Sequence, residues 1–342
     1  MNTCVFYASA RKSCSRRKAS RTQKYSWEEK FNTKKIKNNF MKRMMLWMMA
    51  TLVTAISFSQ TDNKEHTLLW RVTGKDLTKP TYLFGTIHMI CADDIKVSDS
   101  LKSAIQNADR VYLELNLDNV AELMSVMNKM KMRGDTTLAQ LLKPEEYTRV
   151  KSFFSGNKGM IPFSMLETYK PMLAASTLMQ GSLDCKSATA MEQIVMKSAK
   201  RAGKSISGLE TMAFQMGIFD SIPYAFQAKQ LLHYVDNYGK EDSNKEFNEL
   251  IKAYRAQDLG KLEKLTLKED NGVETFTEIM LYRRNEDWVK KLATLMPKQS
   301  LVVAVGAGHL PGKRGVIELL KKAGYTVEPV QNEMIEKFEK QM

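Results

Sequence analysis

Two segments near opposite ends of the chain share one pattern, and this repeat constrains the fold more than any other feature. Residues 82–89 read Tyr-Leu-Phe-Gly-Thr-Ile-His-Met, and residues 303–310 read Val-Ala-Val-Gly-Ala-Gly-His-Leu. Each is an apolar, β-prone run followed by glycine, two further residues and histidine. Gly85 and Gly306 would let the chain turn tightly at a strand end and approach neighbouring backbone closely. The histidines would then project from the rim of a sheet, where open α/β sheets bind their ligands.

His88 and His309, the histidines of these turns, are therefore candidate metal ligands. Two neutral imidazoles can converge on one divalent ion, and a carboxylate completes the common two-histidine, one-carboxylate set. Glu114 is the favoured third ligand, because an acid within the run Val-Tyr-Leu-Glu-Leu is costly to bury unpaired. Glu210 follows another short β-prone run and offers the same rim geometry. An acid–base pair of histidines without a metal is the alternative.

The apolar patterning around these turns predicts one α/β domain over residues 61–342, with a central mixed sheet flanked by helices. From about 118 to 296 the apolar spacing is mostly helical, which predicts a large helical insertion. Methionines at helical spacing there, such as Met124 and Met127, are expected to fill the core. A long helix is expected over 273–295. Six runs are expected to be strands: 68–72, 81–84, 110–116, 205–209, 301–305 and 326–330.

The basic charge of the chain is concentrated at its N-terminus. The formal net charge is +14, and residues 1–43 hold 13 Lys and Arg against two acids. A nucleic-acid-binding protein would carry these charges on a folded surface, interleaved with aromatic residues. The segment is instead polar with little to pack, so no nucleic-acid partner is expected.

Residues 41–60 resemble a signal peptide, with a short basic start, an apolar run and small residues near the end. The apolar run is shorter than the roughly 20 residues that span a bilayer, although an uncleaved anchor is the alternative. We expect Met41 to be the true start and residues 1–40 to be a doubtful basic extension. The mature domain would be periplasmic or secreted, with membrane contact only through the signal or anchor segment.

The remaining cysteines and histidines suggest no further site. Cys91 and Cys185 follow the expected signal, and no Cys-x-x-Cys motif is present. Whether these two cysteines pair stays open, because sequence does not show their separation. His66 and His233 are expected to be structural or exposed.

Five motifs follow one another along the chain: Gly85-Thr86-Ile87-His88, Glu114, Gly208-Leu209-Glu210-Thr211, Arg284-Asn285 and Val305-Gly306-Ala307-Gly308-His309-Leu310-Pro311-Gly312. In this order they resemble the TraB/PrgY/GumN family, which includes the Tiki metalloproteases. The resemblance covers about residues 68–330. It implies a fold like that of the erythromycin esterase and ChaN proteins. It also implies a divalent metal at His88 and His309, manganese or cobalt rather than zinc, with catalytic support from Glu114.

These features favour a metal-dependent hydrolase of the cell envelope, acting as a peptidase on a peptide or protein substrate. Glu114 or Glu210 would act as general base. Arg284 and Asn285, expected near the end of a long helix, would hold a substrate carboxylate or an oxyanion. The alternatives are a protein of the same fold that binds haem or a peptide signal without cleavage, and an esterase of small molecules. Neither HExxH nor Gly-x-Ser-x-Gly is present.

Overall fold

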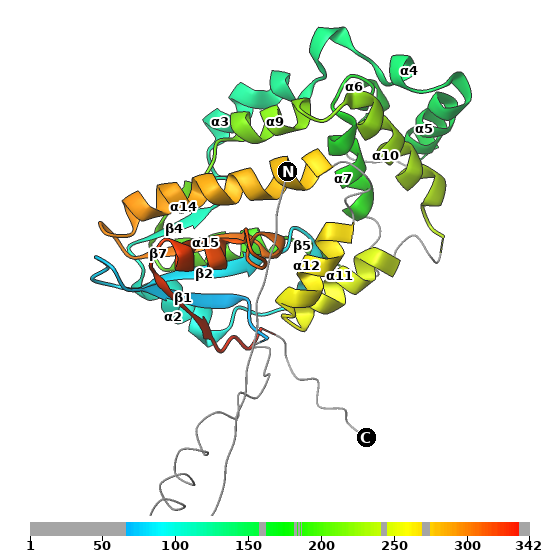
Figure 1. The fold of residues 1–342 in the computed structure, drawn as a ribbon. Helices are drawn as coiled ribbons and strands as arrows, with labels where there is room; N and C mark the ends of the chain where they lie inside the picture. Colours follow the sequence, from blue (N-terminus) through cyan, green and yellow to red (C-terminus); the bar gives the residue numbers. More distant parts are fainter. Residues whose placement is uncertain are drawn as a thin grey trace, which may run out of the picture. The chain divides into compact units, whose positions relative to one another are not determined.

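A six-stranded mixed sheet lies at the centre of the fold, in the order β6-β4-β7-β2-β1-β8 (Figure 1). The computed structural model describes residues 66–156, 162–180, 183, 185, 187–240, 245–268 and 274–334. The predictions for residues 1–60 therefore lie outside the described residues. The strands of this sheet are β1 (Leu69–Thr73), β2 (Thr81–Thr86), β4 (Arg110–Leu113), β6 (Ser205–Gly208), β7 (Leu301–Gly306) and β8 (Thr326–Val330).

Strands β6, β4, β7 and β2 run parallel, and β1 runs antiparallel to both of its neighbours, β2 and β8. The two strands that carry the Gly-x-x-His repeat, β2 and β7, are adjacent in this sheet. Thr86 pairs with Gly306, so the two turns begin side by side, with a one-residue offset between their glycines. The carboxyl ends of the four parallel strands consequently share one edge of the sheet.

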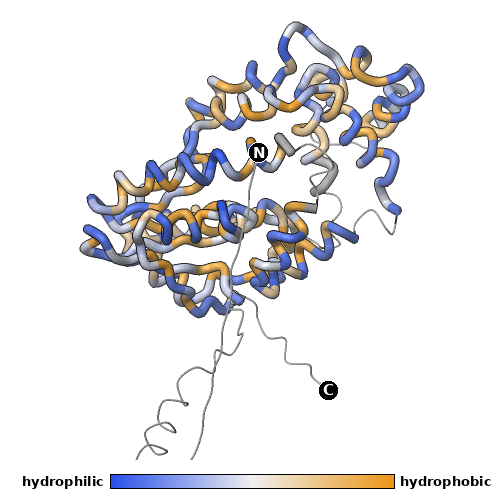
Figure 2. Tube along the Cα trace, in the orientation of Figure 1, coloured by the Kyte–Doolittle hydropathy of each residue, from blue (hydrophilic) through white to orange (hydrophobic). Residues whose placement is uncertain are grey.

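Both faces of the sheet are buried along its central strands β4, β7 and β2, which explains why these strands are continuous apolar runs rather than alternating ones. Along β7, Val302 and Ala304 pack on one face with helices α2, α8, α11 and α12. Val303 and Val305 pack on the other face with α14 and α15. Figure 2 shows these hydrophobic strands between helices with hydrophilic outer turns. The covering helices are α2 (Asp99–Asn107), α8 (Met191–Arg201), α11 (Lys245–Arg255), α12 (Leu259–Lys268), α14 (Arg283–Leu295) and α15 (Val316–Lys322).

The helical middle of the chain has a hydrophobic core of its own, built from Leu138, Val150, Leu166, Ala174 and Leu231 among others. Pro144 begins α5, as expected of a residue that suits the first turn of a helix. The helices of this region are α4 (Leu138–Leu141), α5 (Pro144–Gly156), α6 (Phe163–Leu166), α7 (Pro171–Gln180) and α10 (Tyr224–Asn237).

The expectation that Met124 and Met127 fill the core is wrong. Met124 lies on α3 (Val120–Val126) and is 63% exposed, and Met127 begins the 3-10 turn η2 (Met127–Met130) and is 42% exposed. Helix α3 lies beside α9 (Met212–Asp220), but the described residues of this helix bury only Val126. Helical spacing identifies the apolar face correctly but does not show whether another element covers it.

The long helix expected over 273–295 is interrupted by a π-helical turn. Helix α13 (Glu274–Thr277) leads into the π turn η4 (Glu278–Tyr282), and α14 follows. Arg284 and Asn285 therefore lie in the first turn of α14, not near the end of a long helix. Both are buried. A π turn shifts the register of the residues that follow it and is frequent at functional sites.

A second, two-stranded sheet ties the segment after β2 to the segment before α8. Strand β3 (Ile90–Cys91) pairs with β5 (Ala188–Thr189). Cys91 and Cys185 form a disulfide with their Cα atoms 5.9 Å apart, which answers the question that the sequence left open. In the part of the chain that the structure describes, no helix is long and apolar enough to cross a membrane.

We expect Cys185→Ser to lower the free energy of unfolding by about 2–4 kcal/mol, because the disulfide restricts the unfolded chain across 94 residues. Urea denaturation without reductant would measure this. Reductant should lower the stability of the wild type by a similar amount and leave Cys185→Ser unchanged. Equal stability of the two proteins without reductant would contradict the structural role of this bond.

Candidate active site

The residues singled out from the sequence lie at the carboxyl edge of the parallel strands. Glu114 directly follows β4, and Glu210 lies two residues beyond β6. His88 lies two residues beyond β2, and His309 ends the 3-10 turn η5 (Ala307–His309) that follows β7. Arg284 and Asn285 reach this edge from α14 on one face of the sheet.

Arg284 connects the two glutamates. Its guanidinium is buried, and Nη2 lies 2.6 Å from Oε2 of Glu114 and 2.9 Å from Oε2 of Glu210. Its Nε also donates to both carboxylate oxygens of Glu210, and its Nη1 donates to the backbone oxygen of Met280, one turn earlier. Gln215, which the sequence analysis did not single out, donates from Nε2 to both glutamates. Every nitrogen of the Arg284 guanidinium and every carboxylate oxygen of the two glutamates therefore has a hydrogen-bond partner.

Glu114 is held as a carboxylate anion. Burial alone would raise its pKa, but His309, the Arg284 guanidinium and His88 outweigh burial and lower the pKa to about 2. Its Oε1 accepts a hydrogen bond from the backbone nitrogen of Gly306 at 2.8 Å. A Cβ at Gly306 would lie 3.2 Å from that same oxygen, so the motif glycine permits this close approach.

His309 is a buried, neutral and oriented imidazole. Asn285 fixes its tautomer: the amide Nδ2 donates to the backbone oxygens of His309 and Arg314, which leaves Oδ1 to accept from Nδ1 of His309 at 2.6 Å. The lone pair of Nε2 then faces Nη1 of Arg284 at 3.3 Å and Oε1 of Glu114 at 3.7 Å. Burial lowers the pKa of His309 to about 3, against the attraction of Glu114. Trp288 supports the ring at a centroid distance of 4.5 Å and donates its indole hydrogen to Glu210.

His88 differs from its counterpart, because its side chain is 76% exposed. Its Nδ1 lies 2.9 Å from Oε1 of Glu192, and this hydrogen bond raises the pKa of His88 to about 9. The same carboxylate oxygen accepts from the hydroxyl of Thr86 at 2.6 Å. The two motif histidines therefore have opposite environments, one cationic and accessible, the other neutral and enclosed.

Glu192 is a residue of this site that the sequence analysis missed. It is buried in the first turn of α8, and its Oε2 has no hydrogen-bond partner among the described residues. The available signal was its helical spacing from Val195 and Ala199, which places a carboxylate on the apolar face of the helix. The backbone nitrogen of Met191 donates to the oxygen of Ile87, so the backbone also joins the His88 turn to α8.

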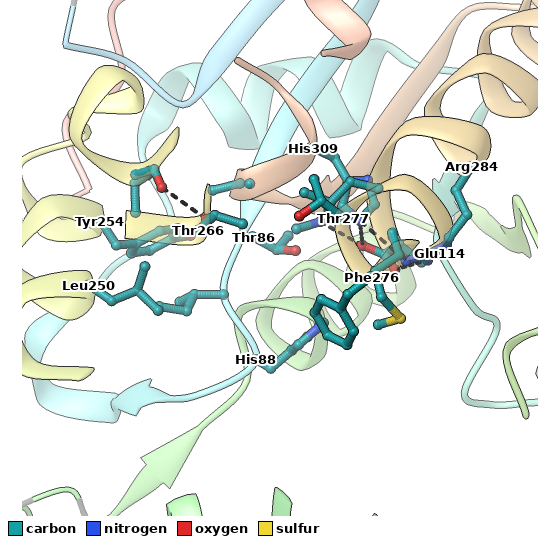
Figure 3. A pocket seen from close by; sticks show the side chains of 17 residues that line it. Thr86, His88, Glu114, Leu250, Tyr254, Thr266, Phe276, Thr277, Arg284 and His309 are labelled. Atoms are coloured by element: carbon teal, nitrogen blue, oxygen red, sulfur yellow. Dashed lines mark hydrogen bonds and ion pairs between the residues drawn. The ribbon is translucent and has the colours of Figure 1, made fainter. Parts of the chain in front are cut away.

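A pocket of about 320 Å³ brings four of the candidate residues together: His88, Glu114, Arg284 and His309 (Figure 3). Glu210 and Asn285 do not line it. Each instead holds a residue that does, Glu210 through Arg284 and Asn285 through His309. The pocket therefore contains an anion, a buried cation, a neutral imidazole and a cationic imidazole.

The donor chemistry fits a divalent metal in part. Ligands of such ions lie at about 2.0–2.2 Å, so two donors of one ion are separated by at most about 4.4 Å. Oε1 of Glu114 and Nε2 of His309, at 3.7 Å, satisfy this limit. Two observations do not fit a bound ion. The lone pair of Nε2 of His309 already faces Nη1 of Arg284. The described residues also contain no group of three or more histidine, cysteine or acidic side chains that could hold a metal ion.

Comparison with known proteins gave one family and a consistent set of relatives. The model of the TraB/PrgY/gumN family matches residues 68–329. The chain is 24% identical to "Metalloprotease TIKI2" of Danio rerio over 80% of this chain and 63% of that protein. It is 25% identical to "Metalloprotease TIKI homolog" of Amphimedon queenslandica, over 77% of this chain and 61% of that protein. The chain thus spans under two thirds of the length of these two relatives. No solved structure gave a significant match.

We expect Glu192→Gln to return the pKa of His88 from about 9 toward its ordinary value of 6.5, because the glutamate hydrogen bond is the main cause of the shift. A titration of the four histidines by NMR measures this in the metal-free protein. Glu318→Gln, which changes a half-buried carboxylate on α15 that pairs with Lys321, is the matched control and should leave His88 unchanged. An unaltered His88 pKa in Glu192→Gln would contradict the contact.

The metal-free protein should lose stability as the pH falls from about 6.5 toward 3. The unfolded chain protonates His309 near pH 6.5, whereas the folded chain does so near 3. Between these values the unfolded state binds more protons, so acid favours unfolding, by up to about 3 kcal/mol at pH 4. Glu114 adds to this loss below about pH 4.5.

Urea denaturation at pH 7 and pH 4 measures this difference for the wild type and two variants. His309→Gln should lose less stability between the two pH values than the wild type. His233→Gln, which changes an exposed histidine on α10, should behave as the wild type does. The same pH dependence in all three proteins would show that His309 is not buried as a neutral ring.

Proposed function

This chain belongs to the TraB/PrgY/gumN family, and we propose that it is a metal-dependent hydrolase that cleaves peptide bonds. The relatives that share about a quarter of its residues carry the name metalloprotease. The match covers under two thirds of each of those proteins, so a protease activity of this chain is a proposal. The chain's own pocket supplies the independent support.

One observation carries the proposal: a neutral imidazole nitrogen and a carboxylate oxygen, each held by a dedicated partner, lie 3.7 Å apart in an open pocket. Asn285 directs the lone pair of His309 away from itself and toward Glu114. A histidine ligand that donates its other ring hydrogen to a fixed acceptor is the usual arrangement at metal sites. His309 and Glu114 would hold the ion, with His88 as the third ligand once its ring has lost its proton.

The bound ion would polarise the scissile carbonyl and lower the pKa of a water molecule. Because Glu114 has a low pKa, we assign it the role of metal ligand rather than that of general base. Arg284 lines the pocket with a permanent cation that can neutralise a developing oxyanion. Glu210 lies behind Arg284 and fixes the orientation of that guanidinium.

A second candidate is hydrolysis of an ester or amide by the two histidines alone. His309 is a neutral base oriented by Asn285, and His88 is a cationic acid supported by Glu192 in the same pocket. Groups with opposed pKa shifts in one site are typical of acid–base pairs. A measurement of metal binding distinguishes the two candidate functions, because only the first requires a bound ion.

We propose in addition that the protein acts outside the cytoplasm. The Cys91–Cys185 disulfide supports this, because such bonds persist in oxidising compartments. The signal-like character of residues 41–60 agrees with it.

The test is calorimetric titration of the metal-stripped protein with manganese, cobalt and zinc. The wild type should bind one ion, and His309→Ala, His88→Ala and Glu114→Gln should each weaken binding by at least about tenfold, since even outer partners of metal ligands contribute 10–100-fold. His233→Ala is the matched control. Circular dichroism confirms that each variant is folded.

The metal-loaded wild type should also cleave members of a peptide library, and Glu114→Gln should bind peptide without cleaving it. No metal binding by the wild type, or unchanged binding by all three variants, would contradict the metal-dependent proposal. Hydrolysis without metal would then favour the two-histidine alternative.

A further inference from the structure

The pocket has an apolar part that the proposed chemistry does not use. The polar groups project from the ends of β2, β4 and β7 and from α14, and the rest of the wall comes from α11, α12, α13 and η4. Figure 3 shows Leu250, Tyr254 and Thr266 across the pocket from Glu114 and Arg284. We call the apolar part of the wall the apolar lobe, and its side chains are Leu250, Tyr254, Leu262, Phe276, Met280 and Leu281. Of these, Phe276 lies on the side of Glu114 and His88.

Three hydroxyl groups beside the apolar lobe already donate their hydrogens to this chain. Tyr254 donates to the backbone oxygen of Gly85 at 3.0 Å, and Thr266 donates to that of Leu262 at 2.9 Å. Thr86 donates to Glu192. A charged or strongly polar group placed in the lobe would lose its water without gaining donors from these hydroxyls, which is costly.

The size of the pocket limits what enters it. Its volume of about 320 Å³ is at the lower end of the range of about 300–1,000 Å³ typical of ligand sites. One or two residues of a peptide fit, and the rest of a longer substrate must lie outside. The lobe therefore contacts a residue next to the bond at the polar end.

We propose that the apolar lobe is a specificity pocket for a bulky uncharged side chain, such as leucine, methionine or phenylalanine, beside the scissile peptide bond. This rests on the proposed peptidase function. Leu250 on α11, Phe276 on α13 and Met280 on η4 contact that side chain, while Glu114, Arg284 and His309 face the scissile bond. Selectivity arises because burial of apolar surface favours the large side chain and charged residues would be desolvated.

The first test uses the full chain loaded with manganese and a peptide library read by mass spectrometry. The wild type should cleave beside leucine, methionine or phenylalanine about 10–100-fold more efficiently, by kcat/KM, than beside alanine, glycine or aspartate. Leu250→Trp, which fills the lobe, should lose this preference. Leu267→Trp, an exposed leucine on α12 outside the pocket, is the matched control and should keep it.

Cleavage with no preference, or a preference that survives in Leu250→Trp, would overturn the proposal. A second measurement separates this result from failure of the peptidase proposal itself. Binding of N-acetyl-leucine amide, N-acetyl-alanine amide and N-acetyl-aspartate amide to the metal-free chain is followed by NMR. Preferential binding of the leucine compound that Leu250→Trp abolishes supports the lobe even if no peptide is cleaved. Equal binding of the three compounds contradicts it.

Discussion

The candidate site depends on the ion pairs that the buried guanidinium of Arg284 forms with two glutamates. This guanidinium pairs with Glu114 and Glu210, which follow different strands, and it faces the free ring nitrogen of His309. A buried cation is tolerated only when anions compensate it, and removal of one partner from such a group typically costs about 3–5 kcal/mol. The carboxylates in turn remain ionised because this cation is fixed. One residue of α14 thereby sets the positions of three turns at the edge of the sheet.

The two Gly-x-x-His turns are equivalent in sequence but not in surroundings. The turn after β7 is covered by α14, so His309 is enclosed by Trp288, Asn285 and Arg284. The turn after β2 leads into β3, where the Cys91–Cys185 disulfide and the β3–β5 pairing hold it beside Glu192. The repeat thus gives two imidazoles with different charge states. This difference suits an acid–base pair, whereas a metal ion would require both rings to be neutral.

That the two histidines project from the rim of a sheet could be predicted from the sequence, because each follows an apolar run and a glycine that permits a tight turn. That their strands are adjacent and parallel is a finding of the structure. Glu114 and Glu210 could be singled out because an acid within an apolar β-prone run, or just after one, needs a partner. The partners could not be predicted: Glu192 and Trp288 lie on helices whose placement depends on tertiary packing. Met124 is exposed for the same reason, since spacing defines a helix face without defining its cover. The π turn before Arg284 was not predicted, because residues 273–295 read as one continuous helix in the sequence.

The proposed function requires that Glu114 and His309 hold one divalent ion. The most direct measurement is a crystal structure of the manganese- or cobalt-loaded protein with anomalous scattering recorded at the metal edge. We expect one anomalous peak within about 2.2 Å of Nε2 of His309 and of Oε1 of Glu114, with the Arg284 guanidinium displaced from that nitrogen. A loaded crystal with no peak in the pocket, and Arg284 still 3.3 Å from Nε2 of His309, would contradict the proposed function.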